Sequence, residues 1–300
     1  VRKNLYLESQ DPGPAENMSP PASGALPQAF FLPTSSGQCF CLFHPPQSDE
    51  LRGCVLYLHP FSEEINCTRR VVAQQARALA QAGYGVLQMD LSGCGDSEGL
   101  FSDATWEAWL QDAHHAHRWL REHAGGPLWL WGMRAGALLA TALANELNEP
   151  CHFLLWQPAI NGQQQLQQFL RLHTAGQWLG TGKGNGPTPA HLLDNGQPVD
   201  AAGYTLSPAL ARGLAAVGLQ PPRRTPGQLV WLELAAQAEP VLSPASEKQL
   251  AVWRAAGWAV SAQALTGPLF WQTVATEDVP ALVQATLSAL TRPATQVAPP

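Results

Sequence analysis

The chain has little charge and contains no long apolar run. Charged residues make up 13% of its 300 residues, and 17 Lys and Arg stand against 23 Asp and Glu, for a net charge of −6. A surface that binds nucleic acid or anionic membranes needs an excess of basic residues, so this balance argues against both as the main partner. No stretch approaches the roughly 18 apolar residues of a membrane-spanning helix. We therefore expect no nucleic-acid partner and no transmembrane segment.

Metal and disulfide patterns are also missing. The six cysteines are scattered, without the spacing of a zinc site or a thioredoxin motif. His114 and His117 share one face of a predicted helix, but a full ligand set is not apparent, so we expect a surface or packing role for them. Reduced thiols favour a cytoplasmic protein. We expect neither a metal nor a cofactor.

What the chain does have is an alternation of apolar strands and amphipathic helices. Hydrophobic residues make up 45% of the sequence, enough for a large core. The predicted strands are 40–43 (an edge strand), 54–58, 85–90, 128–131, 153–156, 228–234 and 258–265. The predicted helices are 69–82, 104–123, 135–147, 163–172, 207–217, 245–256 and 279–290. Strand–helix–strand order predicts an α/β fold with a mostly parallel central sheet and helices on both faces.

Composition divides the chain into a core, an insertion and two tails. Residues 1–29 are rich in Pro, Ser and Gly, and we expect them to be disordered, as we do the tail 293–300. The core comprises 30–160 and 227–292. The stretch between them, 161–226, is too long for an ordinary connection and predicts a cap inserted over the sheet edge.

The segment Trp131–Gly136 has the frame of a nucleophile elbow, G-x-S-x-G, with Arg134 in place of the serine. A guanidinium group is always protonated and cannot be a nucleophile. Serine hydrolases with such an elbow also need a histidine after the last strand, and this chain has none after His191. Function must therefore be argued without the usual serine and histidine.

Arg134 needs a negatively charged partner. It is predicted at the first turn of a helix, where the helix dipole is already positive. A partly buried cation there is costly unless an anion compensates it. The candidates are Glu63, Glu64 and Asp96, or the carboxylate or phosphate of a ligand. An internal ion pair and a ligand contact both remain open, and the two can alternate.

Loops after two other strands supply further candidates. The loop 90–97, Asp-Leu-Ser-Gly-Cys-Gly-Asp-Ser, is predicted to be held by Asp90 and Ser97. Its thiol, Cys94, is either a nucleophile, with His59 as the only obvious base, or a small packing residue. The candidate catalytic residues are His59, Glu63, Glu64, Cys94 and Arg134. The candidate ligand contacts are Phe61, Ser62, Asn66, Arg69, Asp96, Met133, Gln157, Phe270 and Trp271. Phe270 and Trp271 either line an apolar pocket or close the core.

Several of these segments together resemble one family. The run HPFSEE-x-N-x-x-RR, the loop DLSGCGDS, WGMRAG, WQPAING followed by QFLRL, and GPLFWQT are similar to exosortase A system-associated hydrolase 2. The resemblance spans about residues 28–290 and implies the α/β-hydrolase fold with an inserted cap. It also implies a bacterial cytoplasmic protein encoded beside exosortase, PEP-CTERM sorting and exopolysaccharide genes. The family pattern carries arginine at the elbow, so Arg134 resembles a family trait.

Alternative functions follow from this reading. The first is an enzyme that hydrolyses esters or thioesters or transfers acyl groups, with Arg134 anchoring an anion and the loop 59–64 supplying donors or a general base. The second is a non-catalytic relative that binds an anionic ligand, or a partner in the exopolysaccharide pathway. A binder of acyl chains is a third reading. The small-molecule partner that we expect is an acyl or carboxylated ligand, and a homodimer stays open.

Overall fold

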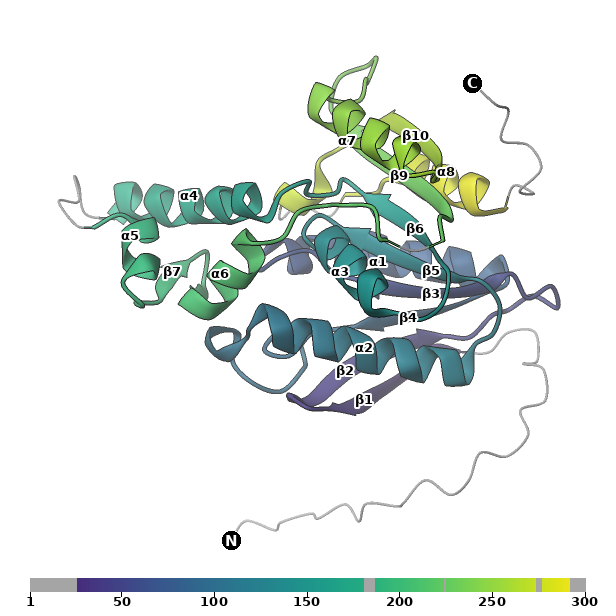
Figure 1. Cartoon of the computed structure of the whole chain (residues 1–300), viewed down its shortest axis with the longest axis horizontal. Helices are drawn as coiled ribbons and strands as arrows, with labels where there is room; N and C mark the ends of the chain where they lie inside the picture. Colours follow the sequence, from purple (N-terminus) through teal and green to yellow (C-terminus); the bar gives the residue numbers. More distant parts are fainter. Residues whose placement is uncertain (1–25, 181–186, 224, 274–276, 292–300) are drawn as a thin grey trace, which may run out of the picture.

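The computed structural model of this chain describes residues 26–180, 187–223, 225–273 and 277–291, and is built around an eight-stranded sheet (Figure 1). The strand order is β1-β2-β4-β3-β5-β6-β9-β10. Pairs β1–β2 and β2–β4 are antiparallel and the others are parallel, so the predicted mostly parallel sheet is confirmed. The strands are β1 Gln28–Thr34, β2 Gly37–His44, β3 Gly53–Leu58, β4 Tyr84–Met89, β5 Leu128–Met133, β6 Cys151–Trp156, β9 Gln228–Ala235 and β10 Ala259–Thr266.

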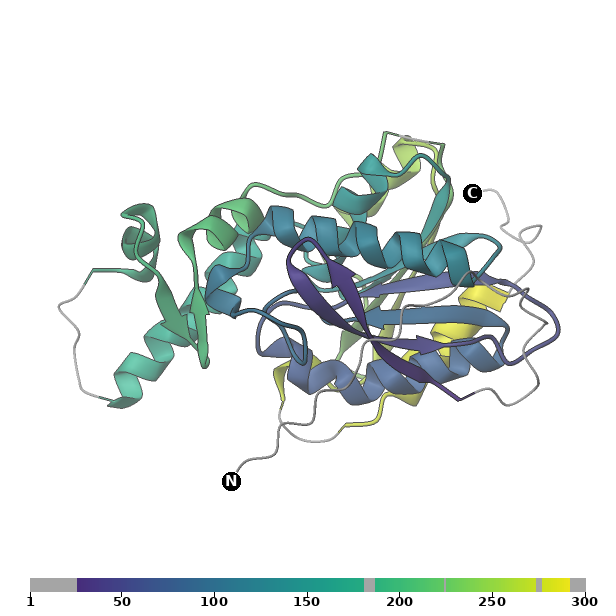
Figure 2. The same cartoon turned by 90° about the horizontal axis from the view of Figure 1, so that it is seen from below.

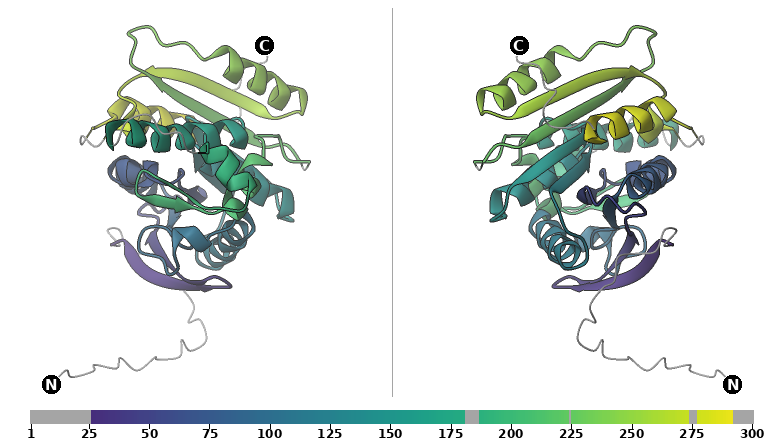
Figure 3. Two further views of the ribbon diagram at one scale, coloured as in Figure 1. Left: turned by 90° about the vertical axis from the view of Figure 1, so that its left-hand side faces the viewer. Right: turned by 90° about the vertical axis from the view of Figure 1, so that its right-hand side faces the viewer.

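Helices cover both faces of the sheet (Figure 3). The helices α2 (Trp106–His123), α3 (Gly136–Glu146) and α7 (Pro244–Ala255) lie on one face, and α1 (Glu64–Gln81) and α8 (Pro280–Thr291) lie on the other. Each central strand therefore needs apolar side chains on both sides. In β3, Leu56 packs into the first helix layer and Val55 into the second, and the whole strand is buried. This double burial explains why the strands read as unbroken apolar runs.

The first edge of the sheet differs from the prediction. The predicted strand 40–43 is present as part of β2, but the prediction that it lies at the edge is wrong. Strand β2 lies between β1 and β4, and β1 is the edge strand. Strand β1 also takes in the last two residues of the stretch predicted to be disordered, 1–29, because Phe30 packs on Trp119 of α2 with ring centroids 4.4 Å apart. Residues 1–25 and the predicted tail 293–300 lie outside the described residues.

Helix α1 begins at Glu64, five positions before the predicted start at Arg69. Ile65 and Thr68 are buried in its first turns, so tertiary packing extends the helix toward the sheet edge. This extension matters for function because it turns Glu63 and Glu64 from loop residues into the start of a helix beside Arg134.

The chain between β6 and β9 projects beyond one end of the sheet (Figure 2). It contains α4 (Gly162–Gly180), α5 (Pro189–Asp194), the hairpin β7 (Val199–Ala201) and β8 (Tyr204–Leu206), and α6 (Pro208–Ala215). The sequence predicts α4 and α6 but not α5 or the hairpin, whose elements are very short. Phe169 of α4 packs edge-on against Phe61 with ring centroids 5.3 Å apart, one of several contacts that join the inserted chain to the sheet edge. Among the described residues, no helix is both long and apolar enough to cross a membrane.

Candidate functional site

The turn from β5 into α3 packs closely against the neighbouring strand because of its glycines. A Cβ on Gly136 would lie 2.1 Å from the carbonyl oxygen of Leu58 in β3. A Cβ on Gly132 would lie 2.5 Å from the Cα of Ala137. Real Cβ atoms do not approach backbone this closely, so both positions require glycine. The geometry predicted for a nucleophile elbow is therefore present.

Arg134 occupies the sharp point of this turn with a φ of 54°. A left-handed conformation costs a residue with a Cβ roughly 1–2 kcal/mol, and it persists only where the surroundings enforce it. Here the Arg134 amide donates to the carbonyl of Trp156 at 3.1 Å, and its carbonyl accepts from the amide of Ala159 at 3.0 Å. These bonds hold the Arg134 side chain at the position where an elbow presents its nucleophile.

The Arg134 side chain is bound on several sides. Its Nε donates to Oε1 of Glu64 at 3.0 Å, and its Nη2 donates to Oε1 of Gln168 in α4 at 2.9 Å. Its Cζ lies 5.8 Å from the ring centroid of Trp271, within the range of a cation–π contact. The side chains of Arg134 and Glu64 are only 12% and 8% exposed. Of the acids that the sequence offered as partners, Glu64 is the one that pairs with Arg134.

Glu64 is a buried acid with one unused oxygen. Burial raises its pKa, and the attraction of Arg134 offsets only part of that shift. Its Oε2 is buried and forms no hydrogen bond of good geometry among the described residues, although the Gln165 side chain lies close enough to lower the pKa of Glu64. Oε2 of Glu63 and Oε1 of Gln165 are likewise buried without a partner among the described residues, so unpaired polar atoms gather beside Arg134 and favour a site there.

A cavity of about 1040 Å³ opens beside this pair, between the carboxyl ends of the strands and helix α4. Trp271, in the short 3-10 helix η2 (Phe270–Gln272), lines this cavity and lies after β10, the last strand, in the part of the chain where a serine hydrolase has its histidine. The Nε1 of Trp271 is buried and donates to no partner among the described residues. The lining includes Phe61, Glu63, Glu64, Asn66, Cys67, Arg134, Gln157, Gln165, Gln168, Phe169, Leu234, Leu269 and Trp271. The cavity therefore combines polar groups around Arg134 with apolar walls.

Sequence reasoning missed Cys67, Gln165 and Gln168. The two glutamines are three residues apart on α4, a spacing that places them on one helix face. Their segment was predicted to be helical, but no pattern in it indicates which face turns toward Arg134. The missed thiol of Cys67 is half-buried, and burial and the nearby Glu63 and Glu64 raise its pKa.

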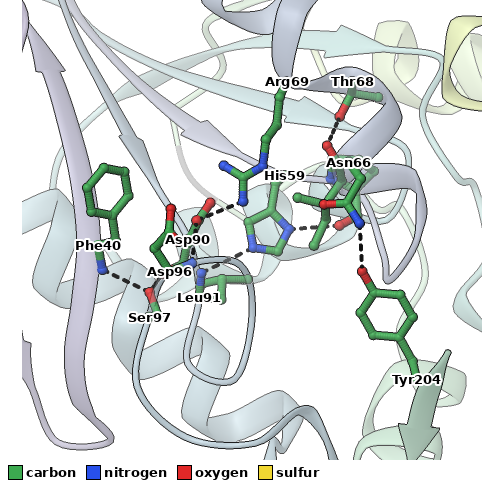
Figure 4. Close-up of polar contacts among 12 residues, drawn as sticks. Phe40, His59, Asn66, Thr68, Arg69, Asp90, Leu91, Asp96, Ser97 and Tyr204 are labelled. Carbon is green, nitrogen blue, oxygen red and sulfur yellow. Dashed lines mark hydrogen bonds and ion pairs between the residues drawn. The ribbon is translucent and has the colours of Figure 1, made fainter. Parts of the chain in front are cut away.

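His59 is not available as a base, which corrects its place among the catalytic candidates (Figure 4). Its Nε2 accepts from the amide of Leu91 at 3.1 Å, so Nδ1 carries the hydrogen and donates to the carbonyl of Pro60 at 2.7 Å. The residue is 5% exposed, and burial lowers its pKa. His59 is a neutral group that ties two loops together.

Cys94 is the second correction. Its thiol is 2% exposed, and burial raises its pKa well above the usual range, with the charge of Asp90 adding to the shift. A nucleophilic thiol needs the opposite environment, one that is electropositive and accessible. The structure therefore favours the packing alternative for Cys94.

The loop after β4 is tied as the sequence predicts (Figure 4). Asp90 Oδ2 accepts from Nη2 of Arg69 at 2.8 Å and from the amide of Asp96 at 3.1 Å. Ser97 Oγ donates to the Asp90 carbonyl and accepts from the amide of Phe40 at 2.8 Å. Arg69 of α1 and Asp96 of this loop, both expected to touch a ligand, hold the loop in place and do not line the cavity.

The other predicted ligand contacts divide between the core and the cavity. Met133, Phe270 and Ser62 are at most 1% exposed and do not line the cavity, which corrects their predicted roles. The side chain of Met133 packs in the core because successive residues of β5 alternate between the two helix layers.

Phe61, Asn66, Gln157 and Trp271 do line the cavity. Asn66 also donates to the Tyr204 hydroxyl of the inserted chain at 3.2 Å. Gln157 is held with a φ of 42°, and its Oε1 accepts from the amide of Leu234 at 2.8 Å.

Comparison with known proteins matches this architecture. Residues 49–194 match the family model described as serine aminopeptidase, S33. The chain is 31% identical over 116 residues to lysophosphatidylserine lipase ABHD12 of Xenopus tropicalis and 34% identical over 116 residues to that of Danio rerio. The match covers 37% of this chain but only 29% of each lipase.

Solved structures extend the likeness to nearly the whole chain. The α/β hydrolase GrgF from Penicillium sp. sh18 superposes with a TM-score of 0.56 at 17% identity, covering 89% of this chain and 98% of that one. XC6422 from Xanthomonas campestris, described as an α/β serine hydrolase without a lid, gives 0.52 at 17% identity, covering 90% and 94%. At this identity the likeness shows the fold alone.

Proposed function

We propose that this protein, which has the α/β-hydrolase fold, binds a small acyl or carboxylated molecule at Arg134 without cleaving it. The observation that carries the proposal is that the site lacks the serine and the histidine of a serine hydrolase. Arg134 stands at the elbow in an ion pair with Glu64, and Trp271 lies in the part of the chain where the histidine would be. Both ring nitrogens of His59 are hydrogen-bonded to the backbone, and Cys94 is buried. Neither residue therefore supplies the nucleophile or base of acyl transfer.

Arg134 retains N–H groups that can donate to a ligand. Its Nε and Nη2 are bound, while Nη1 donates to no partner among the described residues. A carboxyl or carbonyl oxygen is a natural acceptor for this group. The apolar wall from Phe61, Phe169 and Leu269 suits the hydrocarbon part of such a ligand. In this proposal the inserted chain, 161–226, acts as a cap that shields the ligand from water.

The charge of the ligand determines how binding depends on pH. Glu64 already offsets the charge of Arg134, and a ligand carboxylate brings a second negative charge beside it. A carboxylate therefore binds better when Glu64 is protonated, and burial already raises the pKa of Glu64. Carboxylate affinity should rise as pH falls, until the ligand itself is protonated. A neutral ester should not show this dependence.

Calorimetric titration with octanoate and methyl octanoate tests the proposal. We expect the wild type to bind at least one of them, and Arg134→Gln to weaken that binding at least tenfold. Arg70→Gln is the matched control, because Arg70 lies on α1 but is exposed and pairs with Asp278 outside the cavity. Equal affinity in Arg134→Gln and wild type, or no binding of either probe, would contradict the proposal.

Hydrolysis or acyl transfer is the second candidate, and Glu64 is the observation that favours it. A buried carboxyl with a raised pKa and an unused oxygen at a cavity wall is suited to general acid–base catalysis. The lipase names of the relatives agree with an acyl substrate. Turnover of acyl esters and thioesters by wild type, abolished in Glu64→Gln and retained in Cys94→Ala, would establish this alternative in place of simple binding.

The biological setting is a proposal supported by motif resemblance alone. The similarity to exosortase A system-associated hydrolase 2 favours a cytoplasmic role beside PEP-CTERM sorting and exopolysaccharide production. Deleting the gene in its host and measuring exopolysaccharide export tests this setting. Unchanged export and unchanged sorting of PEP-CTERM proteins would argue against it.

A further inference from the structure

A second, smaller pocket adjoins the cavity through Arg134. It has a volume of about 180 Å³ and shares Arg134, Gln157, Gln165 and Gln168 with the larger cavity. Its remaining wall includes Glu233 from β9 and Ser243 and Ser246 from the start of α7. We call it the Glu233 pocket. Because one guanidinium lines both spaces, a single ligand held at Arg134 can extend from one space into the other.

One carboxylate oxygen of Glu233 accepts two hydrogen bonds. Its Oε1 accepts from Nε1 of Trp231 at 2.7 Å and from the hydroxyl of Ser246. Since Ser246 uses its hydrogen on Glu233, the 2.9 Å contact between Ser243 and Ser246 must be donated by Ser243. This chain of donors stabilises a negative charge on Glu233.

The other oxygen of Glu233 is unused. Oε2 forms no hydrogen bond with the described residues, and no Lys, Arg or His among them pairs with Glu233, although the residue is only 9% exposed. Arg134 lines the same pocket but gives its hydrogen bonds to Glu64 and Gln168. Oε2 is not among the fully buried atoms, so it is open to the pocket, and a cation placed beside it would lower the cost of holding a nearly buried carboxylate there.

We propose that the ligand bound at Arg134 also carries a primary ammonium group, which binds Oε2 of Glu233. This inference rests on the proposed function, because it assigns a second group to the same ligand. An ammonium is compact enough for the Glu233 pocket, and its hydrogens match the open carboxylate oxygen, the Ser243 oxygen and the Gln157 side chain. The ligand class is an aminoacyl amphiphile: an amine, a carbonyl or carboxyl group, and a hydrocarbon chain.

The test uses a pair of probes that differ in one group. Glycine octyl ester carries the ammonium, and octyl glycolate has a hydroxyl in its place. At pH 6.5, calorimetry should give at least tenfold tighter binding of the amine by wild type. Glu233→Gln keeps an acceptor oxygen for Trp231 and Ser246 but removes the charge, and should abolish this preference. Glu247→Gln, an exposed acid of α7, is the matched control and should retain it.

The outcomes separate this inference from the proposed function. Equal affinity of wild type for the two probes overturns the ammonium site, as does a preference that survives in Glu233→Gln, which would place the amine at another carboxylate. Octanoate, titrated in parallel, tests binding of a carboxylate at Arg134 independently of the amine preference. If Glu233→Gln does not fold, Glu233→Asp withdraws the charge by one methylene and should reduce the preference.

Discussion

Two regions at the same edge of the sheet use their polar groups in opposite ways. Around β4, Asp90, Arg69, His59 and Ser97 direct their polar atoms at one another and at the backbone. Around the elbow, Oε2 of Glu64, Nε1 of Trp271 and Oε2 of Glu233 have no hydrogen-bond partner among the described residues. The four side chains of the first region satisfy one another, although Oγ of Ser92 in the same loop is buried without a partner among the described residues, whereas the unpaired atoms of the second region line its two pockets.

We infer from this difference that the region around β4 is a structural scaffold and that the region around the elbow is a binding site. A satisfied buried polar network contributes to stability, and breaking it leaves a group without a partner. An unsatisfied buried group lowers stability, and where such groups line a cavity a ligand can supply the missing partners. Mutations in the first region should therefore change the free energy of unfolding, and those in the second should change binding.

Gly136→Ala should have the largest effect on stability. The new Cβ would meet the carbonyls of Leu58 and His59 at 2.1 and 2.6 Å, and backbone atoms cannot move aside easily. We expect a loss of about 3 kcal/mol or more in the free energy of unfolding, measured by urea denaturation. Gly125→Ala is the control, since nothing lies within 4 Å of its Cβ position. A stable Gly136→Ala protein would contradict the close packing of the elbow.

Asp90→Asn should cause the next largest loss in the free energy of unfolding. It removes the charge that pairs with Arg69 and weakens the bond from the Asp96 amide. Because the Arg69 side chain is 44% exposed, solvent screens part of the effect, and we expect a loss of about 2 kcal/mol. Octanoate affinity of the folded protein should not change. A fall in affinity without a fall in stability would move this loop from scaffold to site.

His59 should make stability depend on pH. Burial lowers its pKa in the folded protein, so the unfolded chain binds the proton more readily. Its contribution is present above the ordinary histidine pKa of about 6.5 and is lost as pH falls below it. Urea denaturation of wild type between pH 7.5 and 5 should show this loss.

His59→Gln should reduce that slope by at most about 1.4 kcal/mol per pH unit. Part of the slope should remain, because burial also lowers the pKa of His44 to about 4 and the pKa values of His117 and His152. An unchanged slope in the variant would show that His59 is not held neutral.

Glu64→Gln should change stability least. The amide keeps an oxygen for Nε of Arg134, and the raised pKa of Glu64 means that burial disfavours its charge more than Arg134 favours it, so we expect a difference in the free energy of unfolding within about 1 kcal/mol. Since the pKa of Glu64 is raised, the wild type loses stability as pH rises from the ordinary carboxyl pKa to the raised one, and the variant should not. The pH dependence of octanoate binding should also disappear. A large loss of stability at neutral pH would place Glu64 in the scaffold.

Local patterns in the sequence were sufficient to predict much of the fold. Apolar runs predicted the central strands, and helical spacing predicted the helices that cover them, since both depend on neighbours within a few positions. The elbow frame placed Arg134, and guanidinium chemistry excluded it as a nucleophile. Strand β1 was missed because its hydrophobic residues stand next to a segment rich in Pro, Ser and Gly.

Only the tertiary structure decided which groups meet at Arg134. Glu63 and Glu64 are adjacent acids of the same type, and the rotation of α1 brings Glu64 to Arg134. His59 does not have its predicted role as a base, because the amide of Leu91, in the loop after β4, donates a hydrogen bond to its Nε2. Gln168 and Glu233 come from elements far along the chain. Sequence determines local conformation through short-range sterics and burial, whereas these contacts depend on how distant elements pack.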